Sequence, residues 1–149
     1  MNAICVLSKE QEENLDICIA YSTFGVAKGN VAINAAKSIK EGDLLLIYMS
    51  GIGFIGTAIA SSQAVQINES TNVPNWTYKR QGTENPPWTY LIPWKDYKTI
   101  SPPYKLKFNN GLNEETGIKQ GWLMQAMKNI NSDETKKIKE VIGGLDYGR

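Results

Sequence analysis

One stretch of the sequence, residues 43–62 (DLLLIYMSGIGFIGTAIASS), predicts two apolar strands that fold back on each other. Residues 44–48 form a continuous apolar run that is too short for a globular helix. The small residues at 50–53 tolerate the positive φ angles of a hairpin loop. Gly56 interrupts the second run, and a glycine there marks a β-bulge or a close approach of another backbone or a ligand. We therefore expect the rest of the chain to pack against this hairpin or to open a site beside it.

The segments before the hairpin predict a strand and two helices. Residues 3–7 (AICVL) form a short apolar run, and residues 15–21 then carry apolar side chains near helical spacing. Residues 22–26 break this first helix. Asn30 is placed to cap a second helix, which ends at the polar turn 40–42 directly before the hairpin. The expected order is strand, helix, helix, strand, strand.

After the hairpin the sequence changes to a long polar and aromatic segment, residues 68–87, without helical or strand periodicity. Connections of more than about 12 to 15 residues in a compact domain are usually binding loops, lids or linkers. The aromatic and basic residues in this segment argue against a simple linker, so we expect a binding loop. Strand-like alternation resumes at 88–100 and 104–108, where Pro93 and the proline pair 102–103 confine the strands to edges or bends.

The C-terminal part of the sequence predicts two further helices. The first is indicated by apolar side chains at helical spacing, namely Trp122, Leu123, Ala126, Met127 and Ile130. Residues 131–134 can cap the last helix, whose apolar side consists of Ile138, Val141 and Ile142 and which ends at 143–144. With 42% hydrophobic residues and no internal repeat, the chain fits one domain over residues 1–149.

The composition excludes several classes of catalytic site. Histidine is absent, which removes Ser-His-Asp and Cys-His catalysis and histidine-bound zinc. Cys5 and Cys18 both lie among apolar residues and have no metal-ligand spacing. We therefore expect two buried thiols and no metal or other cofactor.

The charge and hydropathy patterns limit the partners. Sixteen basic residues stand against fifteen acidic ones, so a nucleic-acid contact would have to come from a local patch. No apolar stretch reaches the roughly 18 to 20 residues that span a bilayer, and the N-terminus lacks the pattern of a signal peptide. We expect a cytoplasmic protein without a membrane partner.

Five short motifs resemble, in their order along the chain, those of a known domain family. They are VLS at 6–8, Asn14 placed ten residues before the aromatic residue of FGVAKGN, IKEGDLLLIY, GIGFIGTA, and PPWTYLIPW at 86–94. The chain resembles an EVE domain of the PUA-like superfamily, to which the YTH and ASCH domains also belong. The family usually carries Trp where this chain has Phe24, and the segment after Ser8 and the loop around Trp76 are longer here.

The resemblance implies an α+β fold, a small and partly open β-barrel flanked by helices. It also implies an aromatic-lined pocket that receives a modified base turned out of its strand. Base flipping costs a few kcal/mol, and stacking returns about 1 to 3 kcal/mol per base, so aromatic walls and hydrogen bonds to the base edge are both needed. The expected pocket residues are Phe24, Gly25, Asn14, Ser8, Trp76 and Trp88, and the expected contacts to the nucleic-acid backbone are Lys28, Lys79 and Arg80.

Most of these residues also have a purely structural interpretation. Phe24 and Trp88 could be core aromatics, while Asn14 and Ser8 could cap a helix. The basic residues could be ordinary solvated charges. Trp76 is different, because its polar loop offers no apolar neighbours and a role as the second pocket wall explains it better.

Three functional classes remain open on the sequence. The first is a non-catalytic reader of modified double-stranded DNA, with 5-methyl- or 5-hydroxymethylcytosine preferred and N6-methyladenine as the alternative. The second is an RNA-binding PUA-like module. The third is an enzyme acting on a nucleotide, for which acids are available without a shared spacing, namely Asp43, Asp96 and Glu84.

The resemblance extends to the recognition domains of McrB-like modification-dependent restriction proteins, in which a GTPase motor follows the domain and a nuclease subunit acts with it. This chain has no P-loop, GxxxxGK[ST]. In such a system it would be the N-terminal recognition segment of a longer protein, with GTPase and nuclease activity elsewhere, and we expect the isolated domain to be a monomer.

Overall fold

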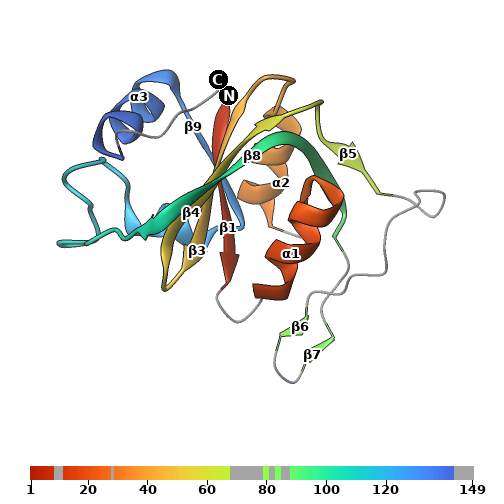
Figure 1. The fold of residues 1–149 in the computed structure, drawn as a ribbon, viewed down its shortest axis with the longest axis horizontal. Helices are drawn as coiled ribbons and strands as arrows, with labels where there is room; N and C mark the ends of the chain where they lie inside the picture. The colour runs from red at the N-terminus through yellow and green to blue at the C-terminus, as the bar shows by residue number, and fades with distance from the viewer. Residues whose placement is uncertain (9–11, 28, 68–78, 81–82, 85–87, 143–149) are drawn as a thin grey trace.

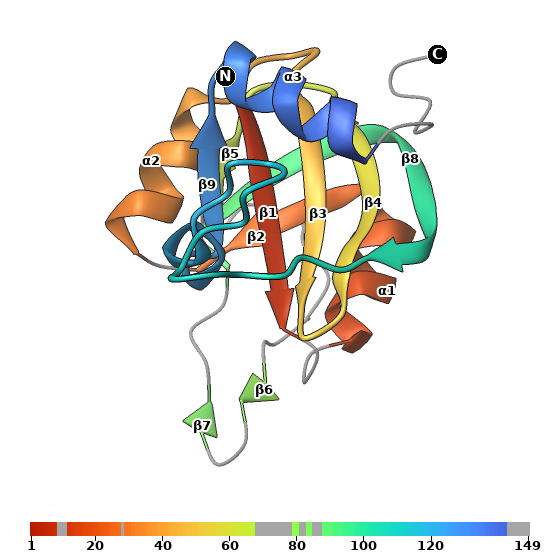
Figure 2. The same ribbon diagram turned by 90° about the vertical axis from the view of Figure 1, so that its left-hand side faces the viewer.

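The expected hairpin lies at the centre of a curled sheet that forms an open half-barrel (Figures 1 and 2). The structure is a computed structural model that describes residues 1–8, 12–27, 29–67, 79–80, 83–84 and 88–142. Its elements are β1 Asn2–Ser8, α1 Glu12–Tyr21, β2 Thr23–Val26, α2 Asn30–Ser38, β3 Leu44–Ser50, β4 Gly53–Ala60, β5 Val65–Gln66, β6 Lys79–Arg80, β7 Thr83–Glu84, β8 Tyr90–Tyr104, the 3-10 helix η2 Gln120–Met124, β9 Met127–Ile130 and α3 Ser132–Val141.

The main sheet has seven strands in the order β2-β8-β4-β3-β1-β9, with β5 also pairing with β8. β1 and β3 are parallel, and β9 runs antiparallel to β1 on its other side. The long strand β8 pairs with β4 through its second half, and with β2 and β5 at residues 90–93. β6 and β7 form a separate two-stranded hairpin.

The hairpin of β3 and β4 is mostly apolar, in agreement with the coverage of both of its faces. Leu45, Ile47 and Met49 belong to a core on the side of α1 and α2. Leu44, Leu46 and Tyr48 alternate with them and belong to a second core beneath α3. Sheets buried on both faces lack the usual alternation of polar and apolar residues, which explains the continuous run in the sequence.

Gly56 lies at an irregularity in the strand pairing, as the sequence predicts. The register between β4 and β8 shifts between Phe54 and Gly56. A Cβ at Gly56 would lie 2.5 Å from the hydroxyl oxygen of Tyr97. The close approach is therefore made by a side chain of β8, where the sequence indicated a backbone or a ligand.

Two predicted features near the ends of helices have different outcomes. The capping box of α3 is confirmed: the Glu134 N–H donates to Asn131 Oδ1 at 2.8 Å, and the Asn131 N–H donates to Glu134 Oε1 at 2.9 Å. The cap at Asn30 is wrong, because α2 begins at this residue and Gly29 occupies the N-cap position with φ 106°. That backbone angle favours glycine, and no side-chain hydrogen bond caps the helix.

The C-terminal half contains the largest errors of the sequence interpretation. The helix expected over residues 122–130 is wrong, because this segment forms η2 and then β9. β9 completes the sheet by pairing with the free edge of β1, and this non-local pairing overrides the helical spacing of the apolar residues. Residues 22–26, expected to be only a helix break, contain β2, and residues 104–108 do not form a separate strand.

Candidate functional site

Two of the predicted pocket residues, Ser8 and Asn14, come from one end of the sheet. β1 ends there at Ser8, α1 begins nearby, and the β6–β7 hairpin projects from the same end in both ribbon views (Figures 1 and 2). Ser8 pairs with Ser50, the last residue of β3. Strand termini and loops at one end of a rigid sheet are a common position for binding residues.

Phe24, Gly25 and Trp88 are brought together although 63 residues of sequence separate Gly25 from Trp88. A Cβ at Gly25 would overlap the indole ring of Trp88, so the ring lies directly against the glycine backbone. Two hydrogen bonds hold the adjoining segment in place, from Thr89 N–H to the Val26 carbonyl and from Thr89 Oγ1 to the Ala27 carbonyl, both at 2.8 Å. The glycine is required here because no side chain fits between β2 and the indole.

Both aromatic rings are buried in this structure. Phe24 is 1% exposed and Trp88 is 6% exposed, and both belong to the core beneath α1 and α2. Two of the expected aromatic pocket residues are therefore core residues in this structure, on the side of the sheet that α1 covers. Their contact with a base remains a prediction.

Asn14 is the most unusual polar side chain of the site. It is 3% exposed and lies within α1, so it does not cap that helix. No residue that the structure describes makes a hydrogen bond with its side-chain amide, whereas buried amides normally have partners. Leaving such a group unpaired costs about 1 to 3 kcal/mol. The arrangement leaves a donor and an acceptor available for a ligand.

The comparison with known families places this geometry in context. The chain matches the family model of the EVE domain over residues 13–141. The protein belongs to the EVE domain family. EVE domains are PUA-like nucleic-acid-binding modules, and the mixed α+β half-barrel agrees with that fold.

A solved structure supports the fold of this EVE domain. The crystal structure of a protein from Pseudomonas putida, determined by a structural genomics consortium, superposes with a TM-score of 0.63. The two sequences are 14% identical, and the match covers 96% of this chain and 100% of the other. No curated protein matches the chain.

The two thiols of the EVE domain are buried and free, as the sequence predicts. Cys18 lies one helical turn after Asn14, and burial raises the pKa of its thiol to about 12. Burial, together with the nearby Cys18, also raises the pKa of Cys5. Both thiols are therefore neutral at physiological pH and lack the thiolate that nucleophilic attack and metal binding require. No group of potential metal ligands occurs among the residues that the structure describes.

The remaining site residues cannot be placed in the same way. Trp76 and Lys28 lie outside the described residues. Lys79 and Arg80 form β6 and pair with Glu84 and Thr83 of β7, but only their backbone is described. Their assignment as backbone contacts for a nucleic acid stays a prediction. Within the described part of the chain, no helix is long and apolar enough to cross a membrane.

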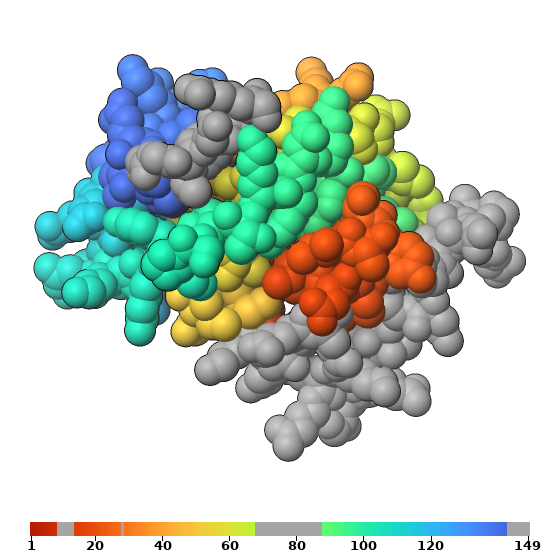
Figure 3. All heavy atoms as spheres, in the orientation of Figure 1, coloured from red at the N-terminus to blue at the C-terminus, as the bar shows by residue number. Residues whose placement is uncertain are grey.

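The structure also shows a groove that the sequence does not predict. It lies between α1, the β3–β4 turn and β8, and has a volume of about 420 Å³. In Figure 3 the atoms of α1 border those of β8 and of the β3–β4 turn. The only sequence signal for this groove is that α1 carries apolar residues on more than one face, for example Cys18 on its buried side and Ile19, which is 42% exposed.

Proposed function

We propose that this EVE domain recognises a modified base in duplex DNA by flipping it out of the helix, with 5-methyl- or 5-hydroxymethylcytosine as the preferred base. The observation that carries the proposal is the buried amide of Asn14, which has no hydrogen-bond partner among the residues that the structure describes. An extruded base presents its Watson–Crick edge to the protein, and flipping enzymes read that edge with hydrogen bonds inside a closed pocket. An amide supplies both a donor and an acceptor for such an edge.

Because the amide of Asn14 is buried, it can discriminate between bases as well as bind one. A pocket built to hydrogen-bond a ligand rejects molecules that leave its polar group unpaired. The 5-methyl group contributes less, because one buried methyl group is worth about 0.8 kcal/mol. We infer that the amide selects the base type and that apolar contact with the substituent adds the preference for the modified form.

The aromatic part of the proposed pocket is formed by the rings near Gly25. Phe24 and Trp88 belong to the same core, and Trp88 lies against Gly25, the neighbour of Phe24 in β2; Trp76 is proposed as the opposite wall. Base stacking against an aromatic ring is worth about 1 to 3 kcal/mol, which offsets the unstacking of the flipped base. Opening of the site to expose a ring face is thus part of the proposal.

The same geometry supports one alternative base. An asparagine amide forms two hydrogen bonds with adenine in standard recognition, so N6-methyladenine in DNA is the second candidate. An RNA partner uses the same stacking and edge contacts. We further propose that the domain is a cytoplasmic, non-catalytic recognition module of an McrB-like restriction system, in which a GTPase motor and a nuclease act on the bound DNA.

Equilibrium binding to a matched set of oligonucleotides tests the proposal. Duplex and single-stranded DNA, and the corresponding RNA, would each carry cytosine, 5-methylcytosine, 5-hydroxymethylcytosine, adenine or N6-methyladenine at one position. We expect tightest binding to duplex DNA with a 5-substituted cytosine. Equal affinity for all members of the set contradicts base recognition, and preference for RNA selects the alternative module.

Two variants connect this measurement to the site. Asn14→Ala should lose about one hydrogen bond to the base edge, worth about 1 kcal/mol or a five- to tenfold change in affinity. Asn34→Ala changes an exposed asparagine of α2 and is the matched control. Both variants should unfold at nearly the wild-type temperature. Retention of the base preference by Asn14→Ala would show that the buried amide does not read the base.

A further inference from the structure

The groove between α1, the β3–β4 turn and β8, here called the α1–β8 groove, lies beside the proposed pocket on the same helix. Asn14 and Cys18 are four residues apart and buried. Leu15 and Ile19 are also four residues apart and line the groove. Residues at this spacing share one helical face, so one face of α1 carries the buried amide of Asn14 and the adjacent face forms a wall of the groove.

The lining of the groove combines apolar walls with a few polar groups. Ile52 and Ile55 of the hairpin and Pro103 of β8 supply apolar surface opposite α1. Asp16, Thr99 and Ser101 supply a carboxylate and two hydroxyl groups. Ligand sites are typically apolar cavities of about 300 to 1,000 Å³ with a small number of such polar groups.

A second cavity continues from the α1–β8 groove. Its volume is about 620 Å³, and it shares Thr99, Ile100, Ser101 and Pro103 with the groove. Lys105 and Lys107 line this second cavity and are exposed. Its carboxylate, Glu115, accepts a hydrogen bond from the Tyr104 hydroxyl at 3.0 Å. We call this second cavity the lysine cavity, because two lysines and one hydrogen-bonded carboxylate line it.

We infer that the α1–β8 groove is a second base subsite, which takes an unmodified nucleotide of the same DNA strand next to the flipped base. This inference rests on the proposed function and extends it to the flanking nucleotide. The occupant follows from charge complementarity and continuity: a base fits between apolar walls, while its phosphate reaches the lysine cavity. Aromatic stacking surfaces beside a positively charged track are the usual means of holding single-stranded nucleotides, and Tyr97 is the aromatic residue that lines the groove.

The carboxylate of Asp16 gives the subsite a chemical preference. A carboxylate accepts hydrogen bonds from the exocyclic amino group of cytosine, and adenine and guanine carry amino groups as well. Thymine has none. The structure thus predicts that the flanking nucleotide is better bound as cytosine, adenine or guanine than as thymine.

An abasic scan tests the subsite on the whole protein. The probe is duplex DNA with one 5-methylcytosine, in which the nucleotides on either side are removed one at a time as abasic sites. We expect one flanking abasic site to weaken wild-type binding by about five- to tenfold, the loss of one base contact. An abasic scan without a sensitive flanking position overturns the inference.

Matched substitutions locate the contact. Ile19 is 42% exposed in the groove and Val31 is 43% exposed on α2, outside it. Ile19→Ser should lose about the same five- to tenfold affinity and become insensitive to the abasic site. Val31→Ser should behave as wild type, and Asp16→Asn should alter the ranking of the flanking bases. If Ile19→Ser binds with wild-type affinity and is still weakened by the abasic site, the flanking nucleotide lies outside the α1–β8 groove.

The lysine cavity provides an independent measurement. Lys105→Gln and Lys107→Gln should each make the dependence of log affinity on log salt shallower by about 0.9, the value for one phosphate contact. Lys40→Gln, in the turn between α2 and β3, is the control. Unchanged slopes in both lysine variants contradict the phosphate path.

These outcomes separate the subsite from the proposed function. Ile19→Ser should keep the preference for modified over unmodified DNA, whereas Asn14→Ala should lose it. If only the Asn14 variant has an effect, the flipped-base pocket stands and the second subsite fails. If modified and unmodified duplexes bind equally while the abasic scan and Ile19→Ser still give the expected losses, base recognition fails and the α1–β8 groove remains a nucleotide site.

Discussion

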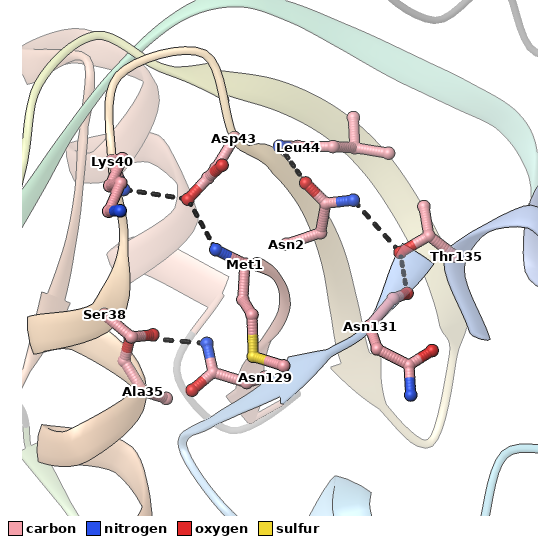
Figure 4. A network of polar contacts seen from close by, with 10 residues as sticks. All are labelled: Met1, Asn2, Ala35, Ser38, Lys40, Asp43, Leu44, Asn129, Asn131 and Thr135. Carbon is pink, nitrogen blue, oxygen red and sulfur yellow. Dashed lines mark hydrogen bonds and ion pairs between the residues drawn. The ribbon is translucent and has the colours of Figure 1, made fainter. Parts of the chain in front are cut away.

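The two ends of β1 differ in how their polar side chains are satisfied. At its beginning, Asn2 Oδ1 accepts a hydrogen bond from the Leu44 N–H at 2.8 Å, and Asn2 Nδ2 donates to Thr135 Oγ1 at 3.0 Å (Figure 4). The N-terminal ammonium group forms an ion pair with Asp43 at 3.1 Å. At the other end, α1 begins and buries Asn14 without a partner among the described residues. The side chains at the first end join strands and helices, whereas near the other end the amide of Asn14 has no partner among the described residues.

A second buried asparagine shows that this difference is not a general property of the residue type. Asn113 is 6% exposed, close to the 3% of Asn14. Its Nδ2 donates to the Lys107 carbonyl at 2.8 Å, and its Oδ1 accepts from the backbone and hydroxyl of Thr116 at 2.8 and 2.6 Å. Natural proteins rarely bury an amide without such bonds. Within the described part of the chain, Asn14 thus differs from Asn113 in having no hydrogen-bond partner for its amide.

The largest expected effect concerns the apolar core beside the candidate site. Phe24→Ala removes a ring that is 1% exposed and should lower the free energy of unfolding by about 3 to 5 kcal/mol. Chemical denaturation measures this, and the melting temperature should fall by about 10 °C. A variant with near wild-type stability would show that the ring is an accessible pocket wall. Burial of apolar side chains would then not be what stabilises the end of the sheet where α1 begins.

The next largest effect compares the two buried asparagines directly. Asn113→Ala leaves the Thr116 N–H and hydroxyl without their acceptor and should cost about 1 to 3 kcal/mol of stability. Asn14→Ala breaks no hydrogen bond of the described structure and should cost clearly less, because relief of the buried amide offsets the small cavity. Denaturation of both variants measures the difference. Equal losses would mean that Asn14 has a structural partner.

The sequence predicts the fold best where the pattern is local. The hairpin of β3 and β4, the buried thiols and the capping box of α3 depend on residues close in sequence, and the structure confirms them. β9 was missed because its stability comes from pairing with β1, which no local spacing indicates. β8 continues through Pro93, which pairs with Thr23, and through the prolines at 102–103, which lie where its pairing with β4 shifts register between Thr99 and Tyr104.

The candidate site shows the same division. Family resemblance predicts Asn14 and the aromatic position at 24, but only the structure shows that the amide is buried without a described partner. The contact of Gly25 with Trp88 joins distant segments, and the α1–β8 groove forms between three elements. Such features arise from tertiary packing, so a single sequence contains no direct signal for them.

A smaller effect concerns the ionisation of the Cys18 thiol beside the candidate site. Because the pKa of Cys18 is about 12 in the folded protein and 9.0 ordinarily, only the unfolded chain ionises as the pH rises above 9. The stability that the neutral Cys18 thiol contributes is therefore fully present below pH 9. It is lost between pH 9 and 12, at up to about 1.4 kcal/mol per pH unit. Urea denaturation from pH 8 to 10.5 should show a shallower decline for Cys18→Ala than for wild type. Parallel declines would contradict a neutral buried thiol next to Asn14.

The smallest expected effect concerns long-range charge at the end of the molecule where β6 and β7 project. The net charge is +1, so binding should depend on a few phosphate contacts and vary weakly with salt. Reversing Lys79 and Arg80 to Glu should weaken modified and unmodified DNA equally, and each lost contact should change the slope of log affinity against log salt by about 0.9. Lys40→Glu, near the network at the start of β1, should leave the slope unchanged. If Lys40→Glu changes the slope and the reversals at Lys79 and Arg80 do not, the DNA follows the other end of β1. The interface then lies at the hydrogen-bonded network around Asn2 and Asp43.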